Sequence, residues 1–405
     1  MGSRRDGARM AECAVSVTAP KGFRASGVTA GLKASGKSDV ALVVNDGPLH
    51  VAAGVFTSNR VVAAPVVWSR QAIQDGRIDA VVLNSGGANA CTGPEGFGDA
   101  HETAEHTAEA LSASGAEVSA GDVAVCSTGL IGLRLDMGAL LPGVTAAVGA
   151  LSATGGDDAA RAIMTTDSVP KTVVVTRDGW SIGGIAKGAG MLAPGLATML
   201  VVITTDATLD AGRAQGALLE ATRVTFGRTD SDGCMSTNDT VLLLASGASD
   251  IAPGPDEFES ALTEACASLA RALIADAEGA SHDISITVTG ATTEAAAEAV
   301  ARAIARSNLF KAAVFGNDPN WGRVVSAVGT VSEDVAPFNP QLLDVWINGV
   351  QVCRGQGVGD DRGLVDLTGR EVEVVVELHA GQAAATIWTN DLTHDYVHEN
   401  SAYSS

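Results

Sequence analysis

The fold is decided by the stretch Lys187-Gly188-Ala189-Gly190-Met191-Leu192-Ala193-Pro194-Gly195-Leu196-Ala197-Thr198-Met199-Leu200. It is a loop rich in glycine and proline, which allow tight turns and close backbone approach. The loop delivers Thr198 to an apolar run, residues 199–203, whose β-branched composition predicts a fully buried strand. A hydroxyl at such a junction suits a nucleophile, because the scaffold fixes it while the loop lets a substrate approach. A threonine that simply begins a strand has the same local pattern.

Composition limits the classes of protein that this chain can represent. Its 405 residues are 46% apolar, enough for about two or three domains or one large unit. The net charge of -21 disfavours nucleic acid and anionic membranes as partners, since both repel an acidic surface. No stretch approaches the roughly 18 uninterrupted apolar residues of a membrane helix. The cysteines lack metal-ligand spacing, which predicts small core residues in a reducing cytoplasm and no metal site; they are Cys13, Cys91, Cys126, Cys234, Cys266 and Cys353.

Strand and helix patterns alternate along the chain. Two amphipathic helices are expected over residues 256–275 and 294–306. Buried strands with helices between many of them predict an α/β (α+β) fold with layered α/β/α packing. The expected strands are Val40–Val44, Val61–Trp68, Ala80–Leu83, Val123–Cys126, Thr172–Thr176, Thr240–Leu244 and Ile284–Val288.

The C-terminal part adds a predicted hairpin. Val372, Val374 and Val376 share one face of an expected strand, and a turn at Gly381 leads into residues 384–389. No linker, repeat or charge run marks a domain boundary. The sequence therefore shows no clean boundary, and both about two or three domains and one large compact unit stay open.

Short strings of polar and small residues recur in a fixed order along the chain. They resemble one family over nearly its whole length, the bifunctional ornithine acetyltransferases (glutamate N-acetyltransferases) of the cyclic arginine pathway. Besides the Lys187–Thr198 run, the strings are Asn84-Ser85-Gly86-Gly87-Ala88-Asn89-Ala90, Ser127-Thr128-Gly129-Leu130-Ile131-Gly132, Ala162-Ile163-Met164-Thr165-Thr166-Asp167, Ser236-Thr237-Asn238-Asp239-Thr240, Asp276-Ala277-Glu278-Gly279, Asp318-Pro319-Asn320-Trp321-Gly322-Arg323 and Glu399-Asn400-Ser401-Ala402-Tyr403-Ser404-Ser405.

The resemblance implies that the precursor cuts itself between Ala197 and Thr198. It also implies a fold like that of the N-terminal-nucleophile enzymes, a layered sandwich of sheets flanked by helices. Self-cleavage would give an alpha chain, residues 1–197, and a beta chain, residues 198–405, as interwoven fragments and not as independent domains. A heterotetramer with two of each chain is implied as well. Cleavage would leave Thr198 a free α-amine, which has an ordinary pKa of about 7.7–8 and can serve as a base near neutral pH.

The resemblance also assigns roles to residues. Thr128 and Gly129, expected in a turn after the strand 123–126, would stabilise the oxyanion of the attacked carbonyl. Lysine can neutralise a substrate carboxylate, and a glutamate can hold an ammonium group. The positions that match the family's amino-acid-binding residues are Thr165, Lys187, Thr198, Glu278, Asn400 and Ser405.

The implied reaction is ping-pong acetyl transfer in the cytoplasm. N-acetylornithine would acetylate Thr198 and leave as ornithine, and glutamate would then take the acetyl group to become N-acetylglutamate. No cofactor is needed for this chemistry, although many members of the family also use acetyl-coenzyme A as donor, an alternative that stays open here.

Three other interpretations compete with this one. The string Gly31-Leu32-Lys33-Ala34-Ser35-Gly36-Lys37-Ser38 has the spacing of a phosphate-binding P-loop, but residues 23–30 do not resemble a buried strand and residues 40–44 do not resemble a helix. An N-terminal-nucleophile amidase or aminopeptidase would share Thr198 and self-cleavage but use water as acceptor. A non-catalytic binding protein would remain as one uncut chain.

Overall fold

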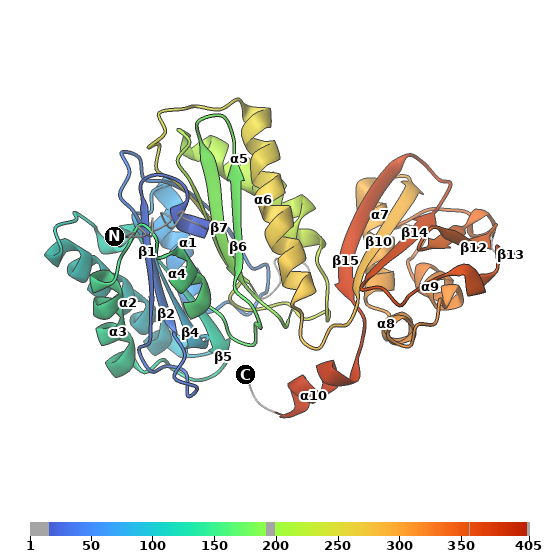
Figure 1. Cartoon of the computed structure of the whole chain (residues 1–405), viewed down its shortest axis with the longest axis horizontal. Coiled ribbons are helices and arrows are strands. Elements are labelled where there is room, and N and C mark those ends of the chain that lie inside the picture. The colour runs from blue at the N-terminus through green and yellow to red at the C-terminus, as the bar shows by residue number, and fades with distance from the viewer. Residues whose placement is uncertain (1–15, 192–198, 356, 403–405) are drawn as a thin grey trace, which may run out of the picture.

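Two sheets stacked face to face form the N-terminal lobe of the computed structural model, and a third sheet forms the C-terminal lobe (Figure 1). The structure describes residues 16–191, 199–355 and 357–402. The first sheet has the order β1 (Phe23–Val28), β2 (Val40–Asn45), β4 (Ala80–Gly87), β5 (Val123–Leu130). The second has the order β3 (Val51–Phe56), β9 (Thr240–Ala245), β8 (Leu200–Thr205), β7 (Ser181–Lys187), β6 (Lys171–Thr176).

Continuous apolar strands are explained by burial on both faces. In β8, Leu200 and Val202 point into the core between the two sheets, whereas Val201 and Ile203 pack against the helices outside. In β2 the same alternation separates Ala41 and Val43 from Val40, Leu42 and Val44. A sheet covered on both sides has no polar face, which is why these strands do not alternate in hydrophobicity.

Helices complete a four-layer α-β-β-α sandwich, which confirms the expected fold class. The outer face of the first sheet packs on α2 and α3, and that of the second packs on α5 and α6. The helices of this lobe are α1 (Ala64–Ala72), α2 (Gly93–Ala113), α3 (Met137–Gly149), α4 (Gly156–Ala162), α5 (Ala211–Val224) and α6 (Pro255–Ala275).

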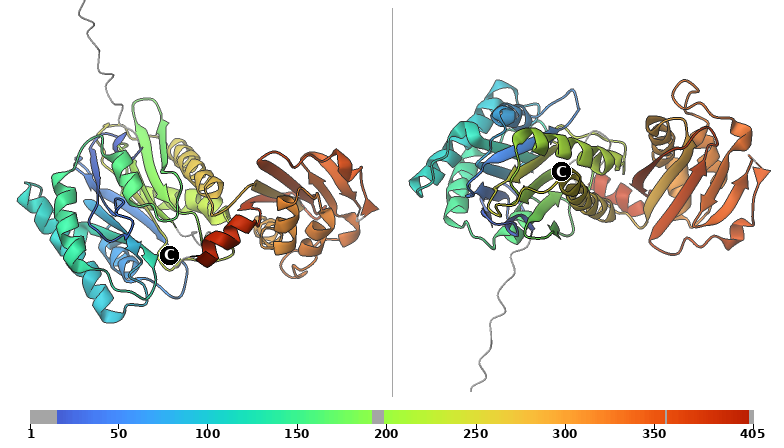
Figure 2. Two further views of the ribbon diagram at one scale, coloured as in Figure 1. Left: turned by 60° about the horizontal axis from the view of Figure 1, so that its bottom comes forward. Right: turned by 90° about the horizontal axis from the view of Figure 1, so that it is seen from above.

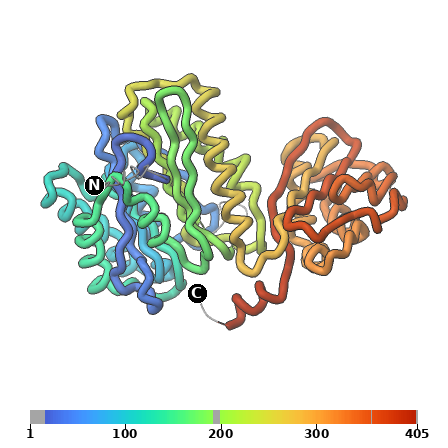
Figure 3. Tube along the Cα trace, viewed as in Figure 1, coloured from blue at the N-terminus to red at the C-terminus, as the bar shows by residue number. Residues whose placement is uncertain are grey.

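The C-terminal lobe has its own hydrophobic core, formed by residues of its sheet and helices. Figure 3 shows that the chain enters this lobe after α6 and leaves it before the last helix. The two segments that connect the lobes lie side by side, because the His282 ring in one is 2.8 Å from the Asp391 carboxylate in the other. The helices of the C-terminal lobe are α7 (Glu294–Ala305), α8 (Asn308–Phe315) and α9 (Trp321–Val328). The last helix, α10 (His394–Ala402), lies between the two lobes (Figure 2).

The predicted C-terminal hairpin is wrong, although both of its strands exist. β10 (Asp283–Ala291) lies between β14 (Glu371–Glu377) and β15 (Ala383–Asn390), parallel to β14 and antiparallel to β15. Local turn residues cannot reveal a strand that enters from about a hundred residues earlier in the chain. The sheet has the order β13 (Gly357–Val358), β12 (Val350–Arg354), β11 (Asp344–Ile347), β14 (Glu371–Glu377), β10 (Asp283–Ala291), β15 (Ala383–Asn390).

Two local predictions in the first lobe are also wrong. The expected strand at Val61–Trp68 is largely replaced by α1, which has Pro65 in its first turn, where a missing N–H costs nothing. Residues 23–28 form β1 despite their broken apolar pattern. The break has a packing reason: a Cβ at Gly27 would lie 2.0 Å from the carbonyl oxygen of Asp158 in α4.

The second sheet joins segments from both sides of the predicted cleavage point. β7 pairs antiparallel with β8, and β3 pairs antiparallel with β9. The cleavage itself stays a prediction, since residues 192–198 lie outside the described part of the chain. Among the described residues no helix is long and apolar enough to cross a membrane. Of the described cysteines, Cys126, Cys266 and Cys353 are buried as expected, but Cys91 and Cys234 are exposed.

The P-loop-like string closes around a side chain of the protein itself. Asp39 is fully buried, and its carboxylate accepts the backbone N–H groups of Ala30, Gly31, Leu32 and Lys33 at 2.6–3.0 Å. The string is followed by β2 and not by a helix. Because the turn's N–H groups already bind an anionic group, this loop does not have the arrangement of a nucleotide site.

We expect Asp39→Ala to lower the free energy of unfolding by about 2–3 kcal/mol, because it removes the acceptor of several partly buried N–H groups. Chemical denaturation measures this change. Asp46→Ala is the control: its carboxylate pairs with Arg24 at the surface and should contribute less than about 1 kcal/mol. Equal losses in the two variants would contradict this account of the loop.

Candidate active site

One cavity of about 310 Å³ collects most of the site residues predicted from the sequence. Its walls come from β5, β7, the loop after α4, the turn after α6, and α10. Segments more than 250 residues apart in the sequence therefore meet here. The lining residues are Thr128, Gly129, Leu130, Ile131, Thr165, Thr166, Lys187, Gly190, Met191, Glu278 and Asn400.

Thr128 and Gly129 lie in the last part of β5, so the expected turn is wrong at this point. β5 continues to Leu130 because it remains parallel to the end of β4, where Ser85 lies opposite Thr128. Gly129 has a φ of +132° and a Cβ there would lie 2.6 Å from the Gly87 nitrogen. Only glycine fits this close approach of two strand ends.

Lys187 is the cation of the cavity and is not the surface lysine that an isolated sequence pattern would favour. It ends β7, is only 2% exposed, and its Nζ donates to Thr128 Oγ1 at 3.1 Å. Burial lowers the pKa of Lys187, while the nearby carboxylates of Asp167, Asp239 and Glu278 act in the opposite direction. A buried ammonium group next to a threonine hydroxyl is suited to bind an anionic ligand group.

Glu278 provides the opposite charge on another wall. Its Oε2 accepts from Asn400 Nδ2 at 2.8 Å, which connects α10 to the turn after α6. Its backbone N–H donates to the Ala189 carbonyl at 2.9 Å. A Cβ at Gly190 would lie 2.6–2.7 Å from the Glu278 carboxyl group, so the glycine lets the two segments touch. The cavity thus places a cation and an anion around one space.

Thr198, Ala197 and Ser405 lie outside the described residues. The structure does describe the residue after Thr198: the Met199 N–H donates to Asp239 Oδ1 at 3.1 Å. Asp239 is fully buried, and burial raises its pKa well above the ordinary value. It belongs to the string at residues 236–240, where no role was predicted for it. The contact between this buried carboxyl and the residue that follows Thr198 in the sequence is a signal that the sequence alone does not contain.

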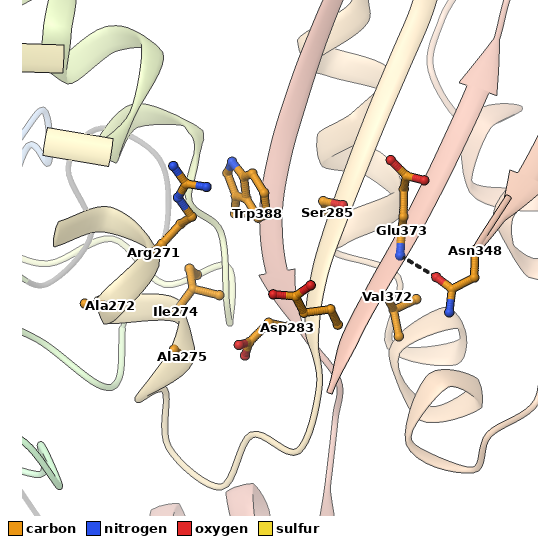
Figure 4. Close-up of a pocket in the computed structure, with 11 residues that line it drawn as sticks. Arg271, Ala272, Ile274, Ala275, Asp283, Ser285, Asn348, Val372, Glu373 and Trp388 are labelled. Carbon is orange, nitrogen blue, oxygen red and sulfur yellow. Dashed lines mark hydrogen bonds between the residues drawn. The ribbon is translucent and has the colours of Figure 1, made fainter. Parts of the chain in front are cut away.

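A larger cavity lies elsewhere in the described part of the chain. It has a volume of about 700 Å³ and lies between the end of α6 and the sheet of the C-terminal lobe (Figure 4). Arg271 stacks over the Trp388 ring at 5.7 Å, and Asn348 accepts from the Glu373 N–H. None of the described residues that were predicted to form the functional site lines this cavity. The volume of a cavity alone therefore does not identify the functional site.

Comparison with known proteins decides the family. A model of the ArgJ family matches residues 24–405. The chain belongs to the ArgJ family. The arginine biosynthesis bifunctional protein ArgJ of Streptomyces coelicolor is 64% identical over 391 residues, which cover 96% of this chain and all of that relative. The protein of the same name from Bifidobacterium longum is 58% identical over 396 residues, again 96% of this chain and all of the relative.

A solved structure is also similar in sequence. The ornithine acetyltransferase of Mycobacterium tuberculosis complexed with ornithine is 59% identical, with a TM-score of 0.44, and the match covers 46% of this chain and 96% of that one. Membership of the ArgJ family confirms the resemblance on which the site residues were selected, and with it the prediction that the chain is a biosynthetic enzyme. The role of each side chain stays a prediction.

Proposed function

We propose that this ArgJ-family chain moves an acetyl group from N-acetylornithine to glutamate through an acetyl-Thr198 intermediate. The observation that supports this most strongly is the cavity itself. It brings together Thr128, Gly129, Thr165, Lys187, Glu278 and Asn400, all of them assigned from the family resemblance and scattered over nearly 300 residues of sequence. Relatives at 58–64% identity over their whole length carry the bifunctional ArgJ name.

Self-cleavage would prepare the nucleophile. The Thr198 hydroxyl attacks the Ala197 carbonyl, the Ala197–Thr198 C–N bond breaks as the peptide shifts to an ester, and this shift frees the α-amine of Thr198. Water then hydrolyses the ester, which releases the two fragments and restores the Thr198 hydroxyl. The fragments would have 197 and 405 − 197 = 208 residues. They would stay together because β7 of one and β8 of the other are neighbours in the same sheet, with buried side chains on both faces.

Acetyl transfer would then occur in two balanced steps. Thr198 Oγ bonds to the acetyl carbon, the amide C–N bond of N-acetylornithine breaks, and the hydroxyl proton passes through the α-amine to the departing ornithine. The α-amine of glutamate next attacks the ester, and Thr198 Oγ leaves and recovers a proton. Thr128 and Gly129 would stabilise the oxyanion that forms in each step.

The two charges of the cavity provide recognition of an amino acid. Lys187 would pair with the substrate carboxylate, and Glu278 with an ammonium group. Ornithine has both groups after the acetyl group has left, and glutamate has an extra carboxylate that needs a cation. Thr165 and Asn400 supply neutral hydrogen-bonding groups on the remaining walls.

The cofactor requirement, the cellular location and the assembly of the enzyme are also proposals. No cofactor is needed, because the acetyl group is only ever bound to an amino acid or to Thr198. The enzyme would work in the cytoplasm as two alpha and two beta chains. Acetyl-coenzyme A is the alternative donor, and an assay with that donor alone decides whether it is used.

The test separates transfer from hydrolysis. Purified enzyme with N-acetylornithine should form N-acetylglutamate when glutamate is present, faster than it releases free acetate. Acetate as the main product, at a rate independent of glutamate, would instead identify the amidase alternative. Parallel detection of N-acetylglutamate and acetate by liquid chromatography and mass spectrometry makes the comparison in one reaction.

A further inference from the structure

A buried ammonium group bridges two carboxylates behind the cavity. Lys171 begins β6 and its side chain is 1% exposed. Its Nζ lies 2.6 Å from Asp167 Oδ1 and 2.6 Å from Asp276 Oδ2. None of these three residues lines the cavity. The family resemblance assigned them no role, although two of them stand inside its strings.

Asp167 connects this cluster to two walls of the cavity. Its Oδ2 accepts the Thr165 N–H at 2.9 Å, and its Oδ1 accepts the Gly188 N–H at 2.7 Å. Gly188 directly follows Lys187, so one carboxylate holds the segments of two cavity residues. Burial opposes the charged form, yet the cations of Lys187 and Lys171 lower the pKa of Asp167 to about 2. It is an anion at any pH at which the enzyme works.

Asp276 connects the cluster to the third wall. It follows the last residue of α6 and lies two residues before Glu278. The Asp276 carboxylate accepts hydrogen bonds from the Ser168 N–H at 3.0 Å and from the Ser168 hydroxyl. Ser168 belongs to the same loop as Thr165 and Asp167. The Lys171 ammonium therefore joins the loop that carries Thr165 to the turn that carries Glu278.

We propose that Lys171 is a positioning residue that fixes the distance between Thr165, Lys187 and Glu278 and thereby sets the affinity of the site for its amino acid. The proposal rests on the proposed function for the identity of the ligand. A buried ion cluster is seldom the most stabilising solution for a core, since apolar side chains of the same volume often do as well. Here the cluster makes directional hydrogen bonds and ion pairs to segments that form three walls of one binding cavity. An apolar cluster would not fix these segments in the same way, because dispersion contacts have no direction.

The proposal predicts an effect on binding larger than the effect on chemistry. Lys171→Met keeps the unbranched apolar part of the side chain and removes the ammonium group, which leaves two carboxylates to repel each other and separates the walls. Loss of one well-placed hydrogen bond to a charged group weakens binding by about one to two orders of magnitude. We expect the Kd of ornithine and the KM of glutamate to rise at least about tenfold, while kcat changes by less than about threefold, because the groups that would carry out the chemistry are not part of the Lys171 cluster.

The experiment uses the full-length purified enzyme. Calorimetry measures ornithine binding, steady-state kinetics gives KM and kcat, and intact mass reports self-cleavage. Asp79→Asn is the matched control, because Asp79 is equally buried and paired with Arg77 but lies at the opposite end of β4 from the cavity. Asp276→Asn is the second variant; it keeps the shape and weakens one tether only, and it decides the question if Lys171→Met does not fold.

A tenfold or larger loss of ornithine affinity in a folded, cleaved variant, with kcat retained and the control unchanged, would support the proposal. Unchanged affinity, or equal losses of kcat and affinity in Asp79→Asn, would overturn it. The wild-type enzyme distinguishes this failure from that of the proposed function: if wild-type protein does not bind ornithine at all, the assignment of the ligand is at fault and not the positioning by Lys171.

Discussion

Thr198→Ala should yield a single uncut polypeptide near 40.7 kDa and no acetyl transfer above about a thousandth of the wild-type rate. Both losses have one cause, since the same hydroxyl would cut the chain and later carry the acetyl group. Without it no α-amine is released and no ester can form. Intact mass spectrometry and an assay of N-acetylglutamate formation measure the two effects on one preparation.

Thr198→Ser is the matched control. Serine keeps the hydroxyl but lacks the methyl group that restricts χ1, so the oxygen is less well aimed. We expect this variant to be cut more slowly and to retain measurable transfer. An uncut, inactive serine variant that is otherwise folded would show that more than the hydroxyl is needed. Full activity of the alanine variant would show that Thr198 is not the nucleophile.

Lys187→Met should reduce kcat/KM for both amino-acid substrates by about 10–100-fold. A hydrogen bond to a charged partner contributes about 1.5–3 kcal/mol, and every 1.4 kcal/mol is a factor of ten. The ammonium group is buried, and among the described residues that line the cavity Lys187 is the only lysine or arginine, so no neighbouring side chain can replace its charge. Lys37→Met is the control, because that lysine is exposed on the loop around Asp39. A loss of the same size in both variants would contradict a specific role.

The pH dependence of KM tests the same lysine. Burial lowers the pKa of Lys187, so the ammonium group loses its proton at a lower pH than a free lysine does. Carboxylate binding should therefore weaken as the pH rises through that pKa, and KM should increase on the alkaline side. Lys187→Met has no proton to lose there and should show a flatter alkaline limb. An identical limb in both proteins would assign the pH dependence to another group.

Much of the fold could be predicted where the local pattern was sufficient. Two-sided burial makes β2, β8 and β9 read as continuous apolar runs, and α6 and α7 show a clear helical stripe. Pairing between distant segments could not be predicted in this way. β10 enters between β14 and β15, and β5 continues past Thr128 because β4 continues beside it. Such strands are determined by their neighbours in space.

The site shows the same division. Residues such as Lys187 and Glu278 could be selected only through the family resemblance, because a lysine after a strand and a glutamate after a helix are ordinary at the surface. The structure buries Lys187 against Thr128 and places Glu278 on Gly190. Asp239 and Lys171 were missed because their significance lies in tertiary contacts, to the Met199 N–H and to two carboxylates.

Trapping the acetyl-Thr198 intermediate shows whether Thr198 carries the acetyl group. Wild-type enzyme is incubated with N-acetylornithine without glutamate, quenched in acid, digested and sequenced by tandem mass spectrometry. We expect one acetyl group on the peptide that begins at Thr198, and we expect it to disappear when glutamate is added before the quench. Transfer at the full rate with no acetyl group on that residue, or with the group on another side chain, would contradict this role of Thr198.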